Sequence, residues 1–211
     1  MRYNRSVADD ELPPGGVEIP NPPWAAWPPA EVAVRLSGVR APWYVASGWA
    51  LDLFRGGPTR AHADIEIGVP ISDFDRVRSA LPGFEIHVVG SGRRWPLDSP
   101  AYERMHQTWV YDAATGHYRL DIFREPHDGD VWIYRRDTRI RRPHASLIER
   151  TADGIPYLAP EVALLFKTKH RRDKDEADFA GALPLLDPAR RAWLAEALTL
   201  VHPDHHWLSR L

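Results

Sequence analysis

The chain has 211 residues, 44% of them hydrophobic, so it is long enough for one sizeable domain or two small ones with an apolar core. Its 27 Lys and Arg nearly balance its 29 Asp and Glu, and a formal net charge of -2 gives no global signature of nucleic-acid or membrane binding. The absence of cysteine excludes disulfides, thiolate metal sites and cysteine nucleophiles. With no signal-like N-terminus and no apolar run long enough for a membrane span, we expect a soluble cytoplasmic protein.

The first half of the chain predicts an irregular arm followed by an α/β unit. Residues 1–29 are rich in proline and acids, a composition typical of an irregular segment, with Trp24 and Trp27 fixing its end to the body. After the arm we expect helices at 30–36, from 48 to about 55 and at 71–81, and strands at 42–46, 63–69, 84–89, 107–112 and 117–123. The last two strands flank AATG, a loop of hairpin length. The predicted fold class is α/β (α+β), a small mixed sheet with flanking helices.

The last third of the chain predicts a helical part. Residues that favour helix starts occur at three places: Pro160-Glu161, Asp173 with Glu176 in the pattern of a capping box, and Asp187-Pro188. The third helix carries a single apolar stripe that must pack on another element. We therefore divide the chain into an arm (1–29), an α/β domain (30–150) and a C-terminal helical domain (151–211).

Acidic residues interrupt two of the predicted apolar strands. Asp64 and Glu66 lie two positions apart in HADIEI, so on a strand their side chains share one face and the isoleucines share the other. Alone, this pattern is typical of a half-exposed strand with a solvated acidic face. However, Asp121 is a third acid inside the apolar run YRLDIF, and Ser47-Gly48 forms a small-residue strand-to-helix corner. Backbone amides at such a corner can receive a phosphate.

Three carboxylates on neighbouring strands indicate a metal site. Mutual repulsion and desolvation both oppose their ionisation, and a divalent cation relieves this conflict. Mg²⁺ favours hard oxygen ligands and completes its shell with water and substrate phosphates. Two such ions can clamp the attacking and leaving oxygens of an in-line displacement at phosphorus, which is the chemistry of nucleotidyl transfer.

These motifs resemble those of a known family. In order and spacing, SGWALDL, TRAHADIEI and RLDIF are similar to the polymerase-beta-like nucleotidyltransferases, most closely the aminoglycoside 2''-adenylyltransferase-like branch. The resemblance extends through LAPEVALLFKTKHRRDKDEADF and covers most of residues 24–208. It implies a small mixed sheet followed by a helical part. It also implies transfer of a nucleoside monophosphate, expected to be AMP from ATP, to a hydroxyl of a small, aminoglycoside-like acceptor.

The resemblance also implies roles for individual residues. Asp64 and Glu66 are the expected metal ligands, and Asp121 helps to hold the metal or acts as a base. The expected nucleotide-binding residues are Ser47, Gly48, Arg60 and Lys167. Family members that modify antibiotics usually carry Gly-Gly at the corner and Asp as the second acid, whereas this chain has Ser47-Gly48 and Glu66.

Several of these residues have a structural alternative. For Arg60, a phosphate contact competes with a salt bridge to one of the acids. Lys167 is the lysine expected to face the cleft, whereas Lys169 suits a solvated position on the same helix. We expect Asp175 and Asp178 to be structural, because acids are common in the first turn of a helix.

Two further clusters favour surface roles. The run DVWIYRRDTRIRRPH is the one basic patch, and its alternating spacing favours a solvated hairpin face over a nucleic-acid site. His202, His205 and His206 lack acids around them in the sequence, so we expect surface residues and no zinc site.

Two other classes of function stay open. One is a catalytically weakened family member that binds a nucleotide or a protein. The other is a metal-dependent nuclease, although Gly68 stands where the commonest nuclease pattern has a lysine.

Overall fold

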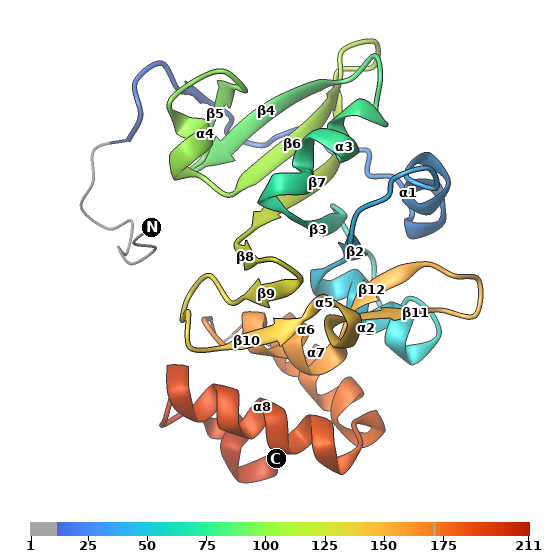
Figure 1. Ribbon diagram of the computed structural model, residues 1–211, viewed down its shortest axis with the longest axis vertical. Helices are drawn as coiled ribbons and strands as arrows, with labels where there is room; N and C mark the ends of the chain where they lie inside the picture. Colours follow the sequence, from blue (N-terminus) through green and yellow to red (C-terminus); the bar gives the residue numbers. More distant parts are fainter. Residues whose placement is uncertain (1–11, 171) are drawn as a thin grey trace.

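A computed structural model describes residues 12–170 and 172–211 (Figure 1). Within these residues, nine strands form a mixed sheet. Their spatial order is β1 (Val17–Glu18), β5 (Arg93–Pro96), β4 (Glu85–Gly90), β6 (Gln107–Asp112), β7 (His117–Glu125), β3 (Glu66–Pro70), β2 (Tyr44–Val45), β12 (Pro156–Leu158) and β11 (Ile148–Arg150). A smaller antiparallel sheet contains β10 (Arg141–Pro143), β9 (Val131–Ile133) and β8 (His127–Asp128). The predicted α/β class with a mixed sheet is confirmed.

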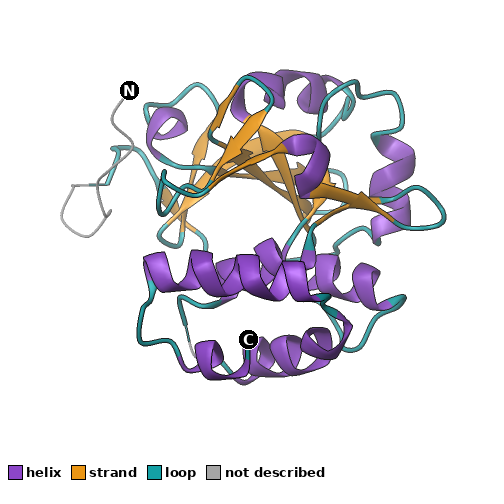
Figure 2. Cartoon of the chain, turned by 60° about the horizontal axis from the view of Figure 1, so that its bottom comes forward, coloured by secondary structure: helices purple, strands orange, loops and turns teal. Residues whose placement is uncertain are grey.

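Helices flank the sheet, and the C-terminal ones gather on one side of it (Figure 2). Their bounds are α1 (Pro29–Arg35), α2 (Ser47–Arg55), α3 (Phe74–Ser79), α4 (Ala101–Arg104), α5 (His144–Leu147), α6 (Pro160–Lys167), α7 (Asp173–Ala182) and α8 (Pro188–Val201). Short 3₁₀ turns cover Ile71–Asp73, Leu183–Leu185 and His206–Arg210. None of the helices in the described chain has the length and apolarity needed to cross a membrane.

The centre of the sheet is the parallel pair β3 and β7. Glu66 lies opposite Asp121 in this pair, and Ile67 lies opposite Ile122. Both isoleucines are fully buried, so the opposite face of each strand belongs to the core. Apolar burial on one face therefore fixes the register that places the two acids side by side on the other.

Helix α2 is built into the core between the sheet and the C-terminal helices. Its residues Ala50 and Leu51 are fully buried, and the helix packs against α6, in which nearly every side chain is buried. Gly56 ends α2 in the left-handed conformation, with φ 88°, which glycine adopts without a steric penalty. The predicted stop at this glycine is confirmed.

Three predicted elements differ from the structure. The strand expected at 63–69 begins only at Glu66, so Asp64 lies in an irregular segment before β3. The helix expected at 71–81 is a 3₁₀ turn followed by the short α3. The capping box is wrong, because Arg172 is the N-cap of α7 and no side chain caps that end. Asp187, in contrast, caps α8 as predicted by accepting a hydrogen bond from the Arg190 amide.

The described part of the expected arm takes part in the fold. Strand β1 pairs with β5, and the Trp95 indole packs against Gly16. Trp24 forms a bridge with Tyr118, and Trp27 is buried, which confirms that the end of the arm is fixed to the body. Residues 1–11 lie outside the described part of the chain. At the other boundary, β12 pairs in parallel with β2, so the sheet continues past residue 150.

Candidate active site

The corner between β2 and α2 has an unusual backbone conformation. Ser47, the first residue of α2, has φ 58°, in the left-handed region that non-glycine residues seldom adopt. At Gly48, a Cβ atom would collide with the Arg60 guanidinium and would lie 2.8 Å from the His62 ring. Glycine is therefore required at position 48 for the close approach of these two side chains. The amide of Ala46 donates to the Glu66 carbonyl at 2.8 Å, which ties the corner to β3.

Two of the three predicted acids meet directly beside this corner. Glu66 and Asp121 face each other on neighbouring strands, and Asp64 is two residues before Glu66. Asp121 is buried, and Gln107 Nε2 donates to its Oδ2 at 2.8 Å. The other oxygen of Asp121, Oδ1, is buried and has no hydrogen bond of normal geometry in the described chain, although the Trp109 side chain is near enough to lower the pKa of Asp121. A buried carboxylate oxygen without a partner is costly unless a ligand satisfies it.

Burial and neighbouring acids raise the pKa values of Glu66 and Asp121. Burial, followed by the charge of Asp64, raises the pKa of Glu66 from 4.5 to about 7. A hydrogen bond from Ser47 and the charge of Lys167 oppose this rise. Burial and the charge of Glu66 raise the pKa of Asp121 well above its usual value. The site is thus a set of carboxylates with too little positive charge around it.

These oxygens suit a hard divalent cation. In residues 12–170 and 172–211, no three or more His, Asp or Glu side chains are grouped tightly enough to hold a metal ion by themselves. Mg²⁺ does not require such a group, because proteins usually bind it through one or two carboxylates together with substrate phosphates and water. Glu66, Asp64 and the unpartnered Oδ1 of Asp121 provide the type of donor that Mg²⁺ prefers.

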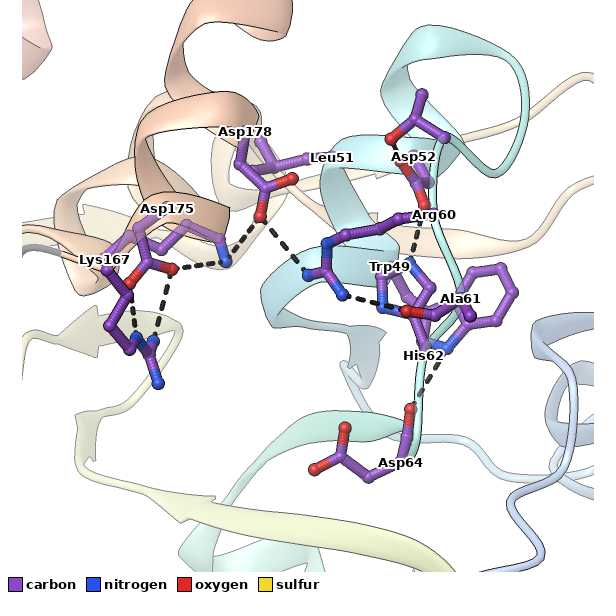
Figure 3. Close-up of polar contacts among 12 residues, drawn as sticks. Trp49, Leu51, Asp52, Arg60, Ala61, His62, Asp64, Lys167, Asp175 and Asp178 are labelled. Atoms are coloured by element: carbon purple, nitrogen blue, oxygen red, sulfur yellow. Dashed lines mark hydrogen bonds and ion pairs between the residues drawn. The ribbon is translucent and has the colours of Figure 1, made fainter.

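Lys167 is a buried cation in an ionic network (Figure 3). Its Nζ lies 2.8 Å from Asp178 Oδ2 and 3.2 Å from Asp175 Oδ1. The expectation that Lys167 is not on the solvent side is confirmed. Its positive charge lowers the pKa of Glu66. Asp175 and Asp178 are the buried counter-ions of Lys167. The predicted reason for their presence, an acid in the first turn of a helix, applies to Asp175 and is wrong for Asp178, which lies beyond the first turn of α7.

Arg60 joins the same network. Its Nη2 lies 3.4 Å from Asp178 Oδ2, and its Nη1 donates to the Ala61 carbonyl at 3.2 Å. Among the described acids, the salt-bridge partner of Arg60 is therefore Asp178 on α7, and not Asp64 or Glu66. This contact joins the segment before β3 to the C-terminal helices.

A pocket opens next to the corner and is lined with cations. Its volume is about 140 Å³, and its wall contains Ser47, Lys167, Arg135, Arg136, Arg172 and Phe166. Arg135 pairs with the buried Glu125 at 2.7 Å, and Arg136 donates to the Phe166 carbonyl at 2.8 Å.

The pocket corrects the interpretation of the basic run. A solvated hairpin face is wrong for Arg135, which is largely covered, and for Arg142, which pairs with the buried Glu161 at 2.5 Å. Arg139 and Arg141 are exposed as expected. Their partners Asp137 and Asp128 are themselves accessible or close to the surface, whereas Glu125 and Glu161, the partners of Arg135 and Arg142, are buried.

Two further groups near the site were not predicted. Gln107 orients Asp121, and Asp52 on α2 accepts hydrogen bonds from the segment that leads to Asp64. Asp52 stands in SGWALDL, where an acid amid apolar residues of a helix was the available signal. The expected surface position is wrong for His205, which is buried and accepts from the Trp207 amide at 3.2 Å. It is correct for His206, which is exposed and pairs with Glu176 at 2.9 Å.

Solved structures of two antibiotic-modifying enzymes share this fold. The crystal structure of the lincosamide antibiotic adenylyltransferase LnuA, lincomycin-bound, aligns with a TM-score of 0.52 and 17% identity, over 74% of this chain and 95% of that chain. The crystal structure of ANT(2'')-Ia in complex with adenylyl-2''-tobramycin aligns with a TM-score of 0.55 and 12% identity, over 81% of this chain and 95% of that chain. Comparison with curated proteins gives no match.

The sequence comparison is more specific than the fold. The profile of one family, described as Aminoglycoside-2''-adenylyltransferase, matches residues 30–180. The match includes the corner, all three acids and the buried Lys167 with its two counter-ions, and it spans well over half of the chain. The chain therefore belongs to the aminoglycoside-2''-adenylyltransferase family of nucleotidyltransferases.

Proposed function

We propose that this chain transfers an adenylyl group from ATP to a hydroxyl of a small-molecule acceptor, and that Asp64 and Glu66 bind Mg²⁺ for this reaction. The observation that carries the proposal is the pairing of Glu66 with Asp121 beside the β2–α2 corner. Both acids have raised pKa values because desolvation and nearby negative charges disfavour their ionised forms; Asp121 is buried and Glu66 is partly buried. A nucleotide bound with Mg²⁺ supplies the positive charge and the phosphate oxygens that this arrangement lacks.

The corner and the cationic pocket are the proposed site for the triphosphate. Amide groups in the first turn of α2 are free to bind a phosphate, because the first amides of a helix have no partner within it. Lys167 and Arg172 line the pocket next to Ser47. In the absence of nucleotide, Asp175 and Asp178 balance the charge of Lys167, so an incoming phosphate competes with them.

The proposed reaction is an in-line displacement at the α-phosphorus of ATP. A bond forms between the acceptor oxygen and this phosphorus, the bond to the β-phosphate oxygen breaks, and pyrophosphate leaves. Asp121 Oδ1 accepts the proton of the attacking hydroxyl, and Gln107 holds the other carboxylate oxygen in place. Burial and the charge of Glu66 raise the pKa of Asp121, which makes its carboxylate a stronger proton acceptor than an ordinary aspartate. Bound Mg²⁺ would stabilise the charge that develops on the phosphate oxygens.

Antibiotic hydroxyls are the first acceptors to consider. The related structures contain lincomycin and adenylyl-2''-tobramycin, so the acceptors differ within this fold. The near balance of charge over the chain gives no support for a nucleic-acid acceptor. Because ATP is the donor, we place the reaction in the cytoplasm.

The test is to incubate the purified chain with Mg²⁺ and labelled ATP, together with tobramycin, lincomycin or a pool of metabolites. We expect pyrophosphate release that depends on an acceptor, and a product heavier than the acceptor by one adenylyl group. The matched control is the Asp121→Asn variant, which has the same shape without the proton acceptor. Nucleotide binding without any product in all mixtures would instead identify a catalytically weakened family member.

A further inference from the structure

Asp64 is a metal ligand in the proposed function, yet it lies outside the sheet. Strand β3 begins at Glu66, so Asp64 is in the irregular segment that joins α2 to β3. Its carboxylate has no hydrogen bond or ion pair with any other described side chain. Figure 3 shows this carboxylate directed away from the network on α2. Contacts elsewhere in the segment must therefore set its position.

Asp52 on α2 is the main anchor of this segment. The side chain is buried, and its Oδ1 accepts from Thr59 Oγ1 at 2.7 Å and from Arg55 Nη2 at 2.7 Å. Its Oδ2 lies 2.6 Å from His62 Nε2. Because a carboxylate only accepts hydrogen bonds when ionised, His62 Nε2 must be the donor in this contact. One buried carboxylate thus holds the segment at residues 59 and 62.

Trp49 continues the connection from His62 to Asp64. The His62 ring stacks on Trp49 with centroids 4.4 Å apart and planes 25° apart. Trp49 Nε1 donates to the main-chain carbonyl of Asp64 at 3.2 Å. Helix α2 therefore holds the backbone of Asp64 by a direct hydrogen bond and the residue two positions before it by Asp52.

We propose that Asp52, His62 and Trp49 are positioning residues that fix the place of Asp64 relative to Glu66 and thereby set the affinity for the metal. This inference rests on the proposed function. Partners that orient a metal ligand without touching the metal typically change metal affinity about 10–100-fold when they are replaced. The same contacts could instead serve folding only, so the test needs a readout that loss of stability does not change.

Three variants separate the contacts. His62→Phe keeps a ring against Trp49 and removes the hydrogen bond to Asp52. His62→Gln keeps a donor and removes the stacked ring. Trp49→Phe keeps the packing and removes the hydrogen bond to the Asp64 carbonyl. The matched control is His206→Phe, which breaks a His–Glu contact of 2.9 Å on the C-terminal helices.

Binding of Mn²⁺ is the decisive measurement. Each protein is titrated with Mn²⁺ in the presence of a non-hydrolysable ATP analogue, and the free ion is measured by electron paramagnetic resonance at a temperature where all variants are folded. We expect His62→Phe and Trp49→Phe to raise the Mn²⁺ dissociation constant about 10-fold or more, His62→Gln to raise it less, and His206→Phe to leave it unchanged. The kcat for transfer should fall in the same order while the KM for ATP changes little.

Two results would overturn the inference in distinguishable ways. If the wild-type chain binds Mn²⁺ and folded His62→Phe and Trp49→Phe bind it equally well, these contacts serve the fold alone and the proposed function stands. If the wild-type chain binds no Mn²⁺ with the analogue, the proposed function itself fails, and the positioning role fails with it.

Discussion

Replacing Glu66 by glutamine removes one negative charge from the carboxylate cluster and keeps the length of the side chain. The pKa of Glu66 is raised from 4.5 to about 7, first by burial and then by Asp64. Because the folded pKa is above the unfolded one, the fold loses stability as the pH rises from about 4.5 through 7. Each pKa unit corresponds to about 1.4 kcal/mol, so ionised Glu66 destabilises the metal-free fold by up to about 3 kcal/mol. Partial exposure of the side chain makes this an upper value.

The assay is chemical denaturation of the metal-free wild type and the Glu66→Gln variant at pH 5 and at pH 8. We expect the variant to be more stable at pH 8 by about 1–3 kcal/mol and nearly equal to the wild type at pH 5. With Mg²⁺ and an ATP analogue, a ligand that binds only the native state should stabilise the wild type by about 2.7 kcal/mol at a hundredfold excess over its Kd and the variant by less, so the difference between them at pH 8 should shrink.

Two observations would refute this reasoning. A Glu66→Gln variant that is less stable than the wild type at pH 8 would mean that the ionised carboxylate is a favourable partner in the fold. A gain of equal size at both pH values would mean that the effect does not come from ionisation. In either case, the charge imbalance that motivates the metal site would lose its support.

Three other substitutions test the site. Asp121→Asn should lower the rate of transfer at least about 100-fold and leave ATP affinity, measured by calorimetry, within a few-fold, because it removes the proton acceptor; a fully active variant would contradict this role. Lys167→Met should destabilise the fold by about 3 kcal/mol in urea denaturation, because buried acids lose a partner. An unchanged midpoint would show that Arg60 and Arg172 suffice as partners. Gly48→Ala should lower stability by about 1–3 kcal/mol and lower activity, because the new methyl group meets Arg60 and His62. Unchanged melting and activity would mean that these side chains move freely.

The acids and the corner could be predicted because their signal is local. A strand period of two and an acid in an apolar run are visible within a few residues, and the register of β3 against β7 then places Glu66 beside Asp121. The start of β3 could not be predicted in the same way. The alternation of side chains continues back to residue 63, but Trp49 and Asp52 on α2 hold this part of the chain instead of a strand ladder. The alternation of apolar and polar residues along the sequence does not predict these side-chain contacts with α2.

The cations of the pocket show the same limit. The partner of Arg135 is Glu125, ten residues earlier, and the partner of Arg136 is the carbonyl of Phe166, thirty residues later. An arginine-rich run in a chain of balanced charge predicts a solvated face. This prediction fails for arginines whose partners lie on distant segments, because the sequence does not show those partners. Burial of Glu125 brings Arg135 into the wall of the pocket. Tertiary contacts, and not the local spacing of the arginines, therefore determine which of these side chains line the pocket.

Ser47 and Glu66, the two residues that depart from the usual family pattern, interact with each other in the structure. Ser47 stands where a glycine is usual, and its left-handed backbone costs about 1–2 kcal/mol relative to glycine. Its hydroxyl, however, interacts with the Glu66 carboxylate and favours the charged form, which lowers the pKa of Glu66. The serine at this corner therefore has an effect on the neighbouring acid that a glycine lacks. A glycine here would leave Glu66 with one donor fewer, and its pKa would then lie further above 4.5. Ser47 and Glu66 therefore act together: the strained residue of the corner favours the ionised form of the acid that we propose as a metal ligand.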